Sequence, residues 1–419
     1  MSPHAPQQAA PDLPLRHGVP ERDEPPPAAE PAPEIVQVIP EFSLHGGAET
    51  VSWELAHNFA RAGVPNRVIA NRVGGPVAPG VTVEPAAAWL SRIPTRGLLR
   101  YLGRLLVVPA FTLAASARLR RHAAAVVISH GDSLAGDVLV VHAVNAQNLE
   151  EKRRGGEWRW RLNPLHLFVA LRDRRMIGGL RYARYVAVSR RVATELQAHY
   201  GVPAGRIEVI PNGIDLGRFS ASAEAGRAIR AEFGIPAEAK VLLFVGHEFG
   251  RKGLAHLVGA LPLLGPEYRI LVVGSDNPGP YRDLAGARAR DVIFAGSRSD
   301  VPAFYAAADA LVHPSSYETF SLVCMEAMAA GILVFATGVG GIEDYLVEGL
   351  NGHFVRPQAT HVAAVIGRAL SVPERVAALR AGARATAERY AWGSISQRYL
   401  DLARRIAAEK ALRRAGPDR

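Results

Sequence analysis

Two carboxylates set eight residues apart are the side chains of this sequence best suited to bind a phosphorylated sugar. Glu318 and Glu326 flank the segment Phe320-Ser321-Leu322, where a helix is expected to begin. Carboxylates accept hydrogen bonds from vicinal hydroxyls, while the free backbone N–H groups that open a helix can face phosphate. Either glutamate alone is best interpreted as a surface salt bridge. The pair in this context predicts a diol and a phosphate bound side by side.

Two adjacent cations, Arg251 and Lys252, follow an apolar run at 241–245 in the loop that begins Gly246-His247-Glu248. Positive side chains at a helix N-terminus oppose the macrodipole unless an anion is bound there. Arginine offers a planar fork for phosphate oxygens and lysine a point charge. The pair therefore predicts a diphosphate site; the alternative is a solvated basic turn. The loop lacks the spacing of a Walker motif.

The elements that must position these groups alternate between short apolar runs and helical patterns. Apolar strands separated by helices indicate parallel sheets covered on both faces. The series is interrupted near Pro211-Asn212-Gly213, a turn-forming cluster. We therefore predict an α/β chain of two doubly wound Rossmann-like domains, 35–211 and 212–388, facing across a cleft. Ligands of such sheets bind beyond the carboxyl ends of the strands, where the residues above are found.

The two ends of the chain have compositions of their own. Residues 1–34 contain ten of the thirty prolines and few large apolar residues, which predicts a disordered tail. Residues 389–419 are expected to form a helix that packs back on the N-terminal domain. The one cysteine, Cys324, excludes an internal disulfide framework and a Cys-rich zinc module and favours a cytoplasmic location. We also expect no membrane-spanning segment and no secretory signal.

The net charge of +10 in 419 residues is concentrated in one region. Residues 92–191 contain nineteen Lys and Arg against six Asp and Glu. Within this region, 97–121 mixes leucines with Arg100, Arg104, Arg118 and Arg120. This stretch predicts either a helix lying on an anionic membrane surface or a core-packed helix with a solvated arginine face, and both readings stay open. Nucleic-acid binding is not favoured, because no docking motif accompanies the cations.

Several phrases of the second half resemble the nucleotide-sugar-binding domain of family 4 retaining glycosyltransferases, which have the GT-B architecture. They are Val209-Ile210-Pro211-Asn212-Gly213, Arg251-Lys252-Gly253, Ala306-Ala307-Ala308-Asp309-Ala310 and the spacing of Glu318 and Glu326. The wording Phe249-Gly250-Arg251-Lys252-Gly253 is most similar to the lipopolysaccharide core glucosyltransferases of this family. The resemblance spans about residues 35–400.

The resemblance implies transfer of a sugar, with retained anomeric configuration, from a UDP- or GDP-sugar to a glycan or lipid-linked acceptor. It implies no metal and no other cofactor, and a role in cell-envelope polysaccharide or lipopolysaccharide synthesis, in the cytoplasm or on the inner face of the cytoplasmic membrane. Arg251 and Lys252 would hold the diphosphate, Glu326 the ribose and Glu318 the transferred sugar. The other donor-binding positions implied are Gly47, Gly296, Ser297, Arg298, Phe320, Ser321 and Leu322.

His142, after the apolar run 138–141, resembles the active-site histidine of the family. The alternative is a core histidine at a strand end. His130 is a weaker candidate for contact with the acceptor. Three places depart from the family pattern: His247 stands where an arginine is usual, Ser321 replaces a common glycine, and Ile332-Leu333 replaces a frequent Pro-Val. A nucleotide-sugar epimerase of the same architecture and a catalytically inactive sugar-nucleotide-binding module remain as alternative functions.

Overall fold

The structure is a computed structural model that describes residues 32–44, 46–93, 100–154, 163–220 and 222–415. Almost all of the expected N-terminal tail therefore lies outside the described residues, as does the start of the basic stretch at 97–99. The side chain of Arg100 lies outside them too, although its backbone belongs to a helix.

In the described part of the first domain, a seven-stranded sheet is accompanied by five α-helices. The strands are β1 (Ile35–Val38), β3 (Asn66–Ile69), β5 (Val81–Glu84), β6 (Val126–Ser129), β7 (Gly136–Val141), β8 (Tyr182–Ala187) and β9 (Ile207–Val209). The helices are α1 (Gly47–Arg61), α2 (Arg100–Leu119), α3 (Asn145–Arg154), α4 (Pro164–Asp173) and α5 (Arg190–Tyr200). Two further strands, β2 (Glu41–Ser43) and β4 (Arg72–Gly74), form a separate two-stranded parallel sheet.

All strands of the first sheet are parallel, in the order β5-β3-β1-β6-β7-β8-β9. The chain runs from β1 outward through β3 to β5 and then returns to the other side of β1 with β6. The strand order therefore reverses between β1 and β6, the place where doubly wound sheets bind ligands. The central strands are buried throughout, as their apolar sequences predict.

The second domain repeats this plan. Its strands are β10 (Lys240–Val245), β11 (Tyr268–Val273), β12 (Val292–Gly296), β13 (Ala310–His313), β14 (Leu333–Ala336) and β15 (His353–Phe354), all parallel in the order β12-β11-β10-β13-β14-β15. Its reversal point lies between β10 and β13. The helices are α6 (Ala223–Glu232), α7 (Leu254–Ala260), α8 (Gly279–Ala285), α9 (Val301–Ala307), α10 (Leu322–Ala329) and α11 (Ala359–Ala369).

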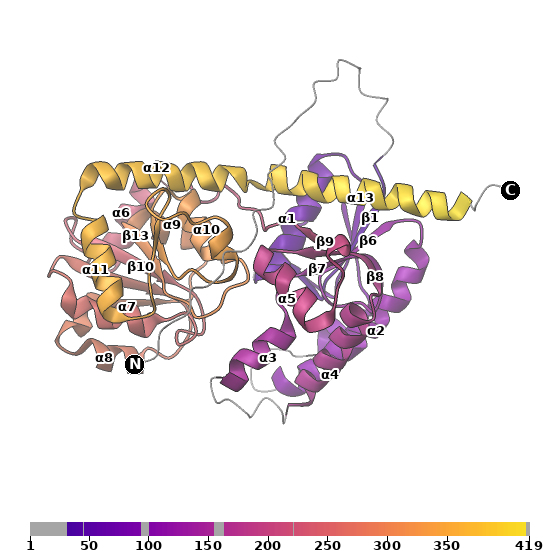
Figure 1. Cartoon of the computed structure of the whole chain (residues 1–419), viewed down its shortest axis with the longest axis horizontal. Coiled ribbons are helices and arrows are strands. Elements are labelled where there is room, and N and C mark those ends of the chain that lie inside the picture. The colour runs from indigo at the N-terminus through magenta and orange to yellow at the C-terminus, as the bar shows by residue number, and fades with distance from the viewer. Residues whose placement is uncertain (1–31, 45, 94–99, 155–162, 221, 416–419) are drawn as a thin grey trace, which may run out of the picture. The chain divides into compact units, whose positions relative to one another are not determined.

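Two helices end the described chain, α12 (Pro373–Arg389) and α13 (Trp392–Ala415). Helix α12 contacts α10 and β14, whereas α13 contacts α1 and β6 (Figure 1). Ion pairs join α13 to the first sheet: Lys410 Nζ lies 2.8 Å from Asp137 Oδ2, and Arg405 lies 2.7 Å from Glu208. The last helix is thus attached to the N-terminal domain.

Helix α2 is long and largely apolar. By length and composition alone, the stretch Leu102–His122 could cross a membrane, although no membrane-spanning segment was predicted from the sequence. Core helices of globular proteins pass the same criterion. Phe111 and Ala115 of α2 are buried in the apolar cluster that includes Val36 and Val38 of β1. One face of α2 therefore covers the first sheet.

Candidate functional site

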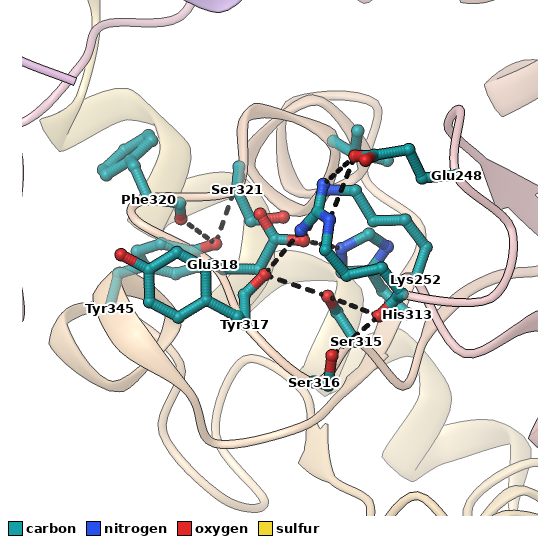
Figure 2. Close-up of polar contacts among 12 residues, drawn as sticks. Glu248, Lys252, His313, Ser315, Ser316, Tyr317, Glu318, Phe320, Ser321 and Tyr345 are labelled. Atoms are coloured by element: carbon teal, nitrogen blue, oxygen red, sulfur yellow. Dashed lines mark hydrogen bonds and ion pairs between the residues drawn. The ribbon is translucent and has the colours of Figure 1, made fainter. Parts of the chain in front are cut away.

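The reversal point of the second sheet brings Lys252 and Glu318 together. Lys252 comes from the loop after β10 and Glu318 from the loop after β13, and Lys252 Nζ lies 2.5 Å from Glu318 Oε1. His313, at the end of β13, donates from Nε2 to the same oxygen at 2.7 Å (Figure 2). Because both bonds use Oε1, Oε2 is the carboxylate oxygen left to accept from a ligand hydroxyl.

The Glu318 carboxylate is buried and ionised. Burial alone raises the pKa of Glu318, but the hydrogen bond from His313 and the positive charge of Lys252 outweigh burial and hold this pKa below its usual range. Burial also lowers the pKa of His313, so this imidazole is neutral at pH 7. The counter-charge of Glu318 is therefore Lys252. The site holds a fixed anion and a cation that a ligand can redirect.

Arg251 has partners of its own. Its Nε and Nη2 donate to Glu248 Oε2 at 3.0 and 2.8 Å, and its Nη1 donates to the Tyr317 carbonyl oxygen at 2.8 Å. Glu248 has φ +56°, so the loop between β10 and α7 turns sharply there. The guanidinium is thus fixed beside Tyr317 and Glu318, one residue away from Lys252.

Two cavities meet this loop region. Cavity A has a volume of about 410 Å³ and is bordered by loops of the second domain, by α1 with the turn before it, and by the linker between the domains. It is lined by Leu44, Gly46, Thr50, Glu54, Gly213, Ile214, Asp215, Arg218, Phe219, Val245, Gly246, His247, Val273, Gly274, Ser297, Arg298, Ser299, Val301, Leu322, Val323, Glu326 and Trp392.

Cavity B, of about 260 Å³, contains the other predicted carboxylate. It is lined by Ala143, Asn145, Asn148, Leu149, His166, Glu248, Arg251, Tyr317, Glu318 and Thr319. The two glutamates that the sequence paired therefore serve different spaces: Glu326 lines cavity A and Glu318 lines cavity B.

Glu326 is half-buried on α10, with a tyrosine as its partner. Tyr305 donates from its hydroxyl to Glu326 Oε2 at 2.8 Å. Burial raises the pKa of Glu326, and the bond from Tyr305 opposes that rise. Cavity A is also lined by Ser297 and Arg298, directly after Gly296 at the end of β12. The Arg298 guanidinium is bound to Glu232 at 2.6 Å and Asp300 at 2.8 Å, so its backbone is the part free for a ligand.

The segment from Phe320 to Leu322 is rigidly held. Phe320 is buried and packs against Tyr345 with ring centroids 5.5 Å apart. The Tyr345 hydroxyl lies 3.0 Å from the Phe320 carbonyl oxygen and 3.2 Å from that of Ser321 (Figure 2). Ser321 has φ +66°, a left-handed conformation that glycine adopts without strain. The geometry thus explains why glycine is common at this position, and Leu322 begins α10 at the wall of cavity A.

The turn that opens α1 also approaches cavity A. Gly46, rather than the predicted Gly47, is the residue that lines this cavity. Gly46 has φ +115°, and an added Cβ would meet the carboxylate of Glu49. Gly47 is the first residue of α1. The turn that opens α1 lies where the sequence predicted it, and contact of Gly47 with a donor stays a prediction.

The histidines of the first domain form a hydrogen-bonded pair. His142 Nε2 lies 3.0 Å from His130 Nδ1, and His130 Nε2 lies 2.9 Å from Gln37 Oε1. Burial lowers the pKa of His142 to about 4 and that of His130 well below its usual value. Both rings are therefore neutral at pH 7. Ala143, the residue after His142, lines cavity B.

In cavity A, nothing in the sequence pointed to Glu54, and no role was assigned to His247 from the sequence. His247 Nδ1 accepts from the Ser275 backbone N–H at 3.3 Å, so its proton is on Nε2 and can be donated. The departure from the usual arginine was the signal for this residue. Glu54, on α1, has its pKa raised to about 7 by burial and by the charge of Asp215. No sequence signal marks Glu54, because it stands within an ordinary helical pattern.

No group of three or more His, Cys, Asp or Glu side chains within the described ranges is arranged to hold a metal ion. That donor transfer needs no metal stays a prediction. Cys324 is buried in α10 and burial raises its pKa to about 12, in keeping with a packing role for this thiol.

Comparison with known proteins decides the family. Residues 226–386 match the family model of glycosyl transferases group 1, and residues 45–218 match that of Glycosyltransferase Family 4. The two matches adjoin and together cover most of the chain. The chain belongs to the family 4 glycosyltransferases.

Two proteins similar in sequence to this chain have names that state different activities. The chain is 36% identical over 233 residues to the D-inositol 3-phosphate glycosyltransferase of Xylanimonas cellulosilytica, covering 52% of this chain and 55% of that protein. It is 32% identical over 216 residues to the lipopolysaccharide glucosyltransferase WaaG of Escherichia coli, covering 49% and 54%. The chain thus spans about half of the length of these relatives.

Solved structures confirm the GT-B fold of this family 4 glycosyltransferase. The crystal structure of WaaG, a glycosyltransferase involved in lipopolysaccharide biosynthesis, superposes with a TM-score of 0.72 at 23% identity, covering 88% of this chain and 99% of that one. The Anabaena protein HepE, solved with UDP and glucose, gives a TM-score of 0.65 at 19% identity, covering 88% and 99%. At these identities the likeness concerns the fold. The predicted pair of doubly wound domains is confirmed.

Proposed function

We propose that the chain transfers a sugar from a UDP- or GDP-sugar to a glycan or lipid-linked acceptor, with retained anomeric configuration and without a metal. The observation that carries this proposal is the Lys252–Glu318 ion pair at the reversal point of the second sheet. An anion and a cation in contact, with family membership established, fit a site that separates a sugar from its diphosphate.

The nucleoside of the donor would occupy cavity A. Glu326 accepts from the ribose hydroxyls, and the backbone of Ser297 and Arg298 faces the base. The diphosphate lies at the start of α10, where free backbone N–H groups and the helix dipole favour an anion. His247 donates from Nε2 in the place of the arginine usual in the family, and Lys252 turns from Glu318 to the phosphates.

The transferred sugar would lie between the two cavities. Glu318 Oε2 accepts from sugar hydroxyls, and cavity B receives the acceptor. As the bond to the leaving diphosphate breaks, Arg251 and Lys252 stabilise the negative charge that develops on it. The leaving phosphate oxygen takes the proton of the acceptor hydroxyl, so no separate base is needed. The incoming oxygen and the leaving group then use the same face, which retains the configuration.

An acceptor in the cell envelope would place the enzyme at the inner surface of the cytoplasmic membrane. Leu102, Leu106 and Leu113 are exposed on one side of α2, at spacings of four and seven residues. Helix α4, which contacts α2, exposes Leu167 and Leu171. We name these five side chains the leucine surface.

The arginines contribute unequally to this surface. Arg104 follows Leu102 by two residues, which places it roughly 200° around the helix, away from the leucines. By the same helical geometry Arg118 is also turned away from the leucines. Arg120, just after α2, is exposed, and so are Arg174 and Arg175, just after Leu171. We therefore assign insertion to the leucine surface and attraction to anionic lipid to Arg120, Arg174 and Arg175.

The enzymatic proposal is tested with a panel of UDP- and GDP-sugars, by thermal shift and by release of nucleoside diphosphate. We expect one donor to raise the unfolding temperature and to be turned over. Lys252→Ala and Glu326→Ala should abolish turnover, whereas Lys240→Ala should not. Lys240 is a matched control because it pairs with Glu267 at the surface. Full activity of the first two variants contradicts the site; donor binding without any transfer or hydrolysis indicates an inactive module.

The stereochemistry is read by proton NMR of the first product formed. An axial donor that gives an axial product supports retention, and an equatorial product contradicts it. Recovery of a donor epimer in place of a transfer product identifies the epimerase alternative.

A further inference from the structure

A row of hydrogen-bonded side chains crosses the reversal point of the first sheet. Gln37 is on β1, His130 directly follows β6, and His142 directly follows β7. Gln37 is fully buried, His130 is 6% exposed, and His142 is half-buried. The row therefore leads from the core of the domain to His142, the residue before Ala143 of cavity B.

The hydrogen bonds of this row all run in one donor-to-acceptor direction, which the side-chain amide of Gln37 sets. Gln37 Oε1 lies 2.9 Å from His130 Nε2, and the amide nitrogen of Gln37 is buried without a hydrogen-bond partner among the described residues. An amide oxygen only accepts, so His130 Nε2 carries the proton, and Nδ1 of the neutral ring carries a lone pair. His130 Nδ1 can then only accept from His142 Nε2, 3.0 Å away. His142 is left with its own lone pair on Nδ1.

The neutrality on which this direction depends has a physical cause. Burial disfavours the imidazolium form of both rings, and a charge on His142 further disfavours one on His130. The two rings are stacked with centroids 5.3 Å apart, so two imidazolium ions there would repel each other.

We propose that Gln37 and His130 are positioning residues that hold His142 as the Nε2–H tautomer, which leaves His142 Nδ1 to accept a hydrogen bond from a substrate hydroxyl. Nε2 of His142 is occupied by His130, so Nδ1 is the nitrogen available to a ligand. Ala143, next in the chain, lines cavity B beside Glu318 and Arg251. The substrate part of this inference rests on the proposed transferase function; the tautomer part does not.

The tautomers are measured in the wild-type chain by long-range ¹⁵N–¹H NMR of the imidazole rings. Signals are assigned by their loss in His130→Asn and His142→Asn. His57 is an internal control, because its Nδ1 lies 2.7 Å from the Trp53 carbonyl oxygen and its Nε2 accepts from the Ala78 N–H at 3.2 Å. Those backbone partners force the opposite, Nδ1–H, tautomer. We expect Nε2–H at His130 and His142; Nδ1–H at either ring overturns the proposal.

The effect of Gln37 on the tautomer of His142 is tested with Gln37→Met, which keeps the length of the side chain and removes the acceptor. We expect the His142 signal to change to a mixture of tautomers and kcat to fall about tenfold, the effect of one hydrogen bond. The KM for the donor should stay unchanged, because cavity A is untouched. The control is Thr112→Val, another buried polar group of this domain. It should leave tautomers and kcat as in the wild type.

The outcomes separate the two proposals. If the wild type turns over no nucleotide sugar, the proposed function fails, while the NMR pattern still decides the tautomers. If the wild type is active and folded Gln37→Met keeps both the wild-type kcat and the wild-type His142 signal, the positioning role is wrong. Should Gln37→Met fail to fold, the wild-type spectrum alone decides.

Discussion

Lys252 and Glu318 are 66 residues apart in sequence, yet the Lys252 ammonium lies 2.5 Å from the Glu318 carboxylate. Their side chains are only 14% and 8% exposed. Removal of either charge therefore leaves the other buried without its partner, which is costly. The contact explains why the site keeps an ionised carboxylate below the surface, and it links the proposed donor site with stability.

The stability that Glu318 contributes should depend on pH. Its folded pKa is below its unfolded pKa, so the contribution is complete at neutral pH and is lost as the pH falls from about 4.5 towards the lowered value. Glu318→Gln should therefore lower the free energy of unfolding at pH 7 by about 1–3 kcal/mol and by less at pH 4. Urea denaturation at both pH values measures this. An equal loss at both would contradict the ion-pair interpretation.

Glu54 should affect the pH dependence of stability in the opposite direction to Glu318. Its folded pKa of about 7 is above the usual value for a glutamate, so stability is lost as the pH rises from about 4.5 through 7. Glu54→Gln removes this penalty and should raise the unfolding temperature at pH 8 but not at pH 5. Thermal unfolding in two buffers measures the difference. Asp215→Asn should give a smaller gain, since the charge of Asp215 is a lesser cause than burial. A shift that is the same at both pH values would refute the prediction.

His247 should act on donor binding through Nε2–H. We expect His247→Ala to raise the KM for the donor about tenfold with a smaller change in kcat, the loss of one hydrogen bond to a charged group. His247→Gln places an amide N–H near the same position and should recover part of the affinity. Steady-state kinetics on the donor identified above checks both variants. An unchanged KM in His247→Ala would assign the diphosphate to other groups.

Membrane attachment should depend on the leucine surface more than on the arginines named from the sequence. Flotation with anionic liposomes should recover the wild type, and replacing Leu102, Leu106 and Leu113 by Ser should abolish recovery. The matched control replaces Leu263, Leu284 and Leu350, exposed leucines of the second domain. Charge reversal at Arg104 and Arg118 should reduce flotation only slightly. If the leucine variant floats like the wild type, α2 is a core helix with a solvated face.

Much of this protein follows from local sequence alone. Continuous apolar runs identified the parallel strands, and the glycine- and charge-rich loops after them predicted the ligand side of each sheet, because both signals depend on residues close together in the chain. The spacing of Glu318 and Glu326 was also readable, since one loop and one helix contain both. The family resemblance added roles that residue types alone could not assign.

The tertiary structure decided which residues that are distant in the sequence come into contact. Sequence treated Lys252 as a free phosphate-binding cation and Glu318 as a sugar-binding acid; only the adjacency of β10 and β13 places them in contact. The tertiary structure also places Glu318 and Glu326 in two different cavities, buries Glu54 so that its pKa rises, and brings Gln37 into contact with His130 from a neighbouring strand. Long-range contacts, burial and electrostatic coupling depend on which strands neighbour each other in the sheets, and that order is a property of the whole fold.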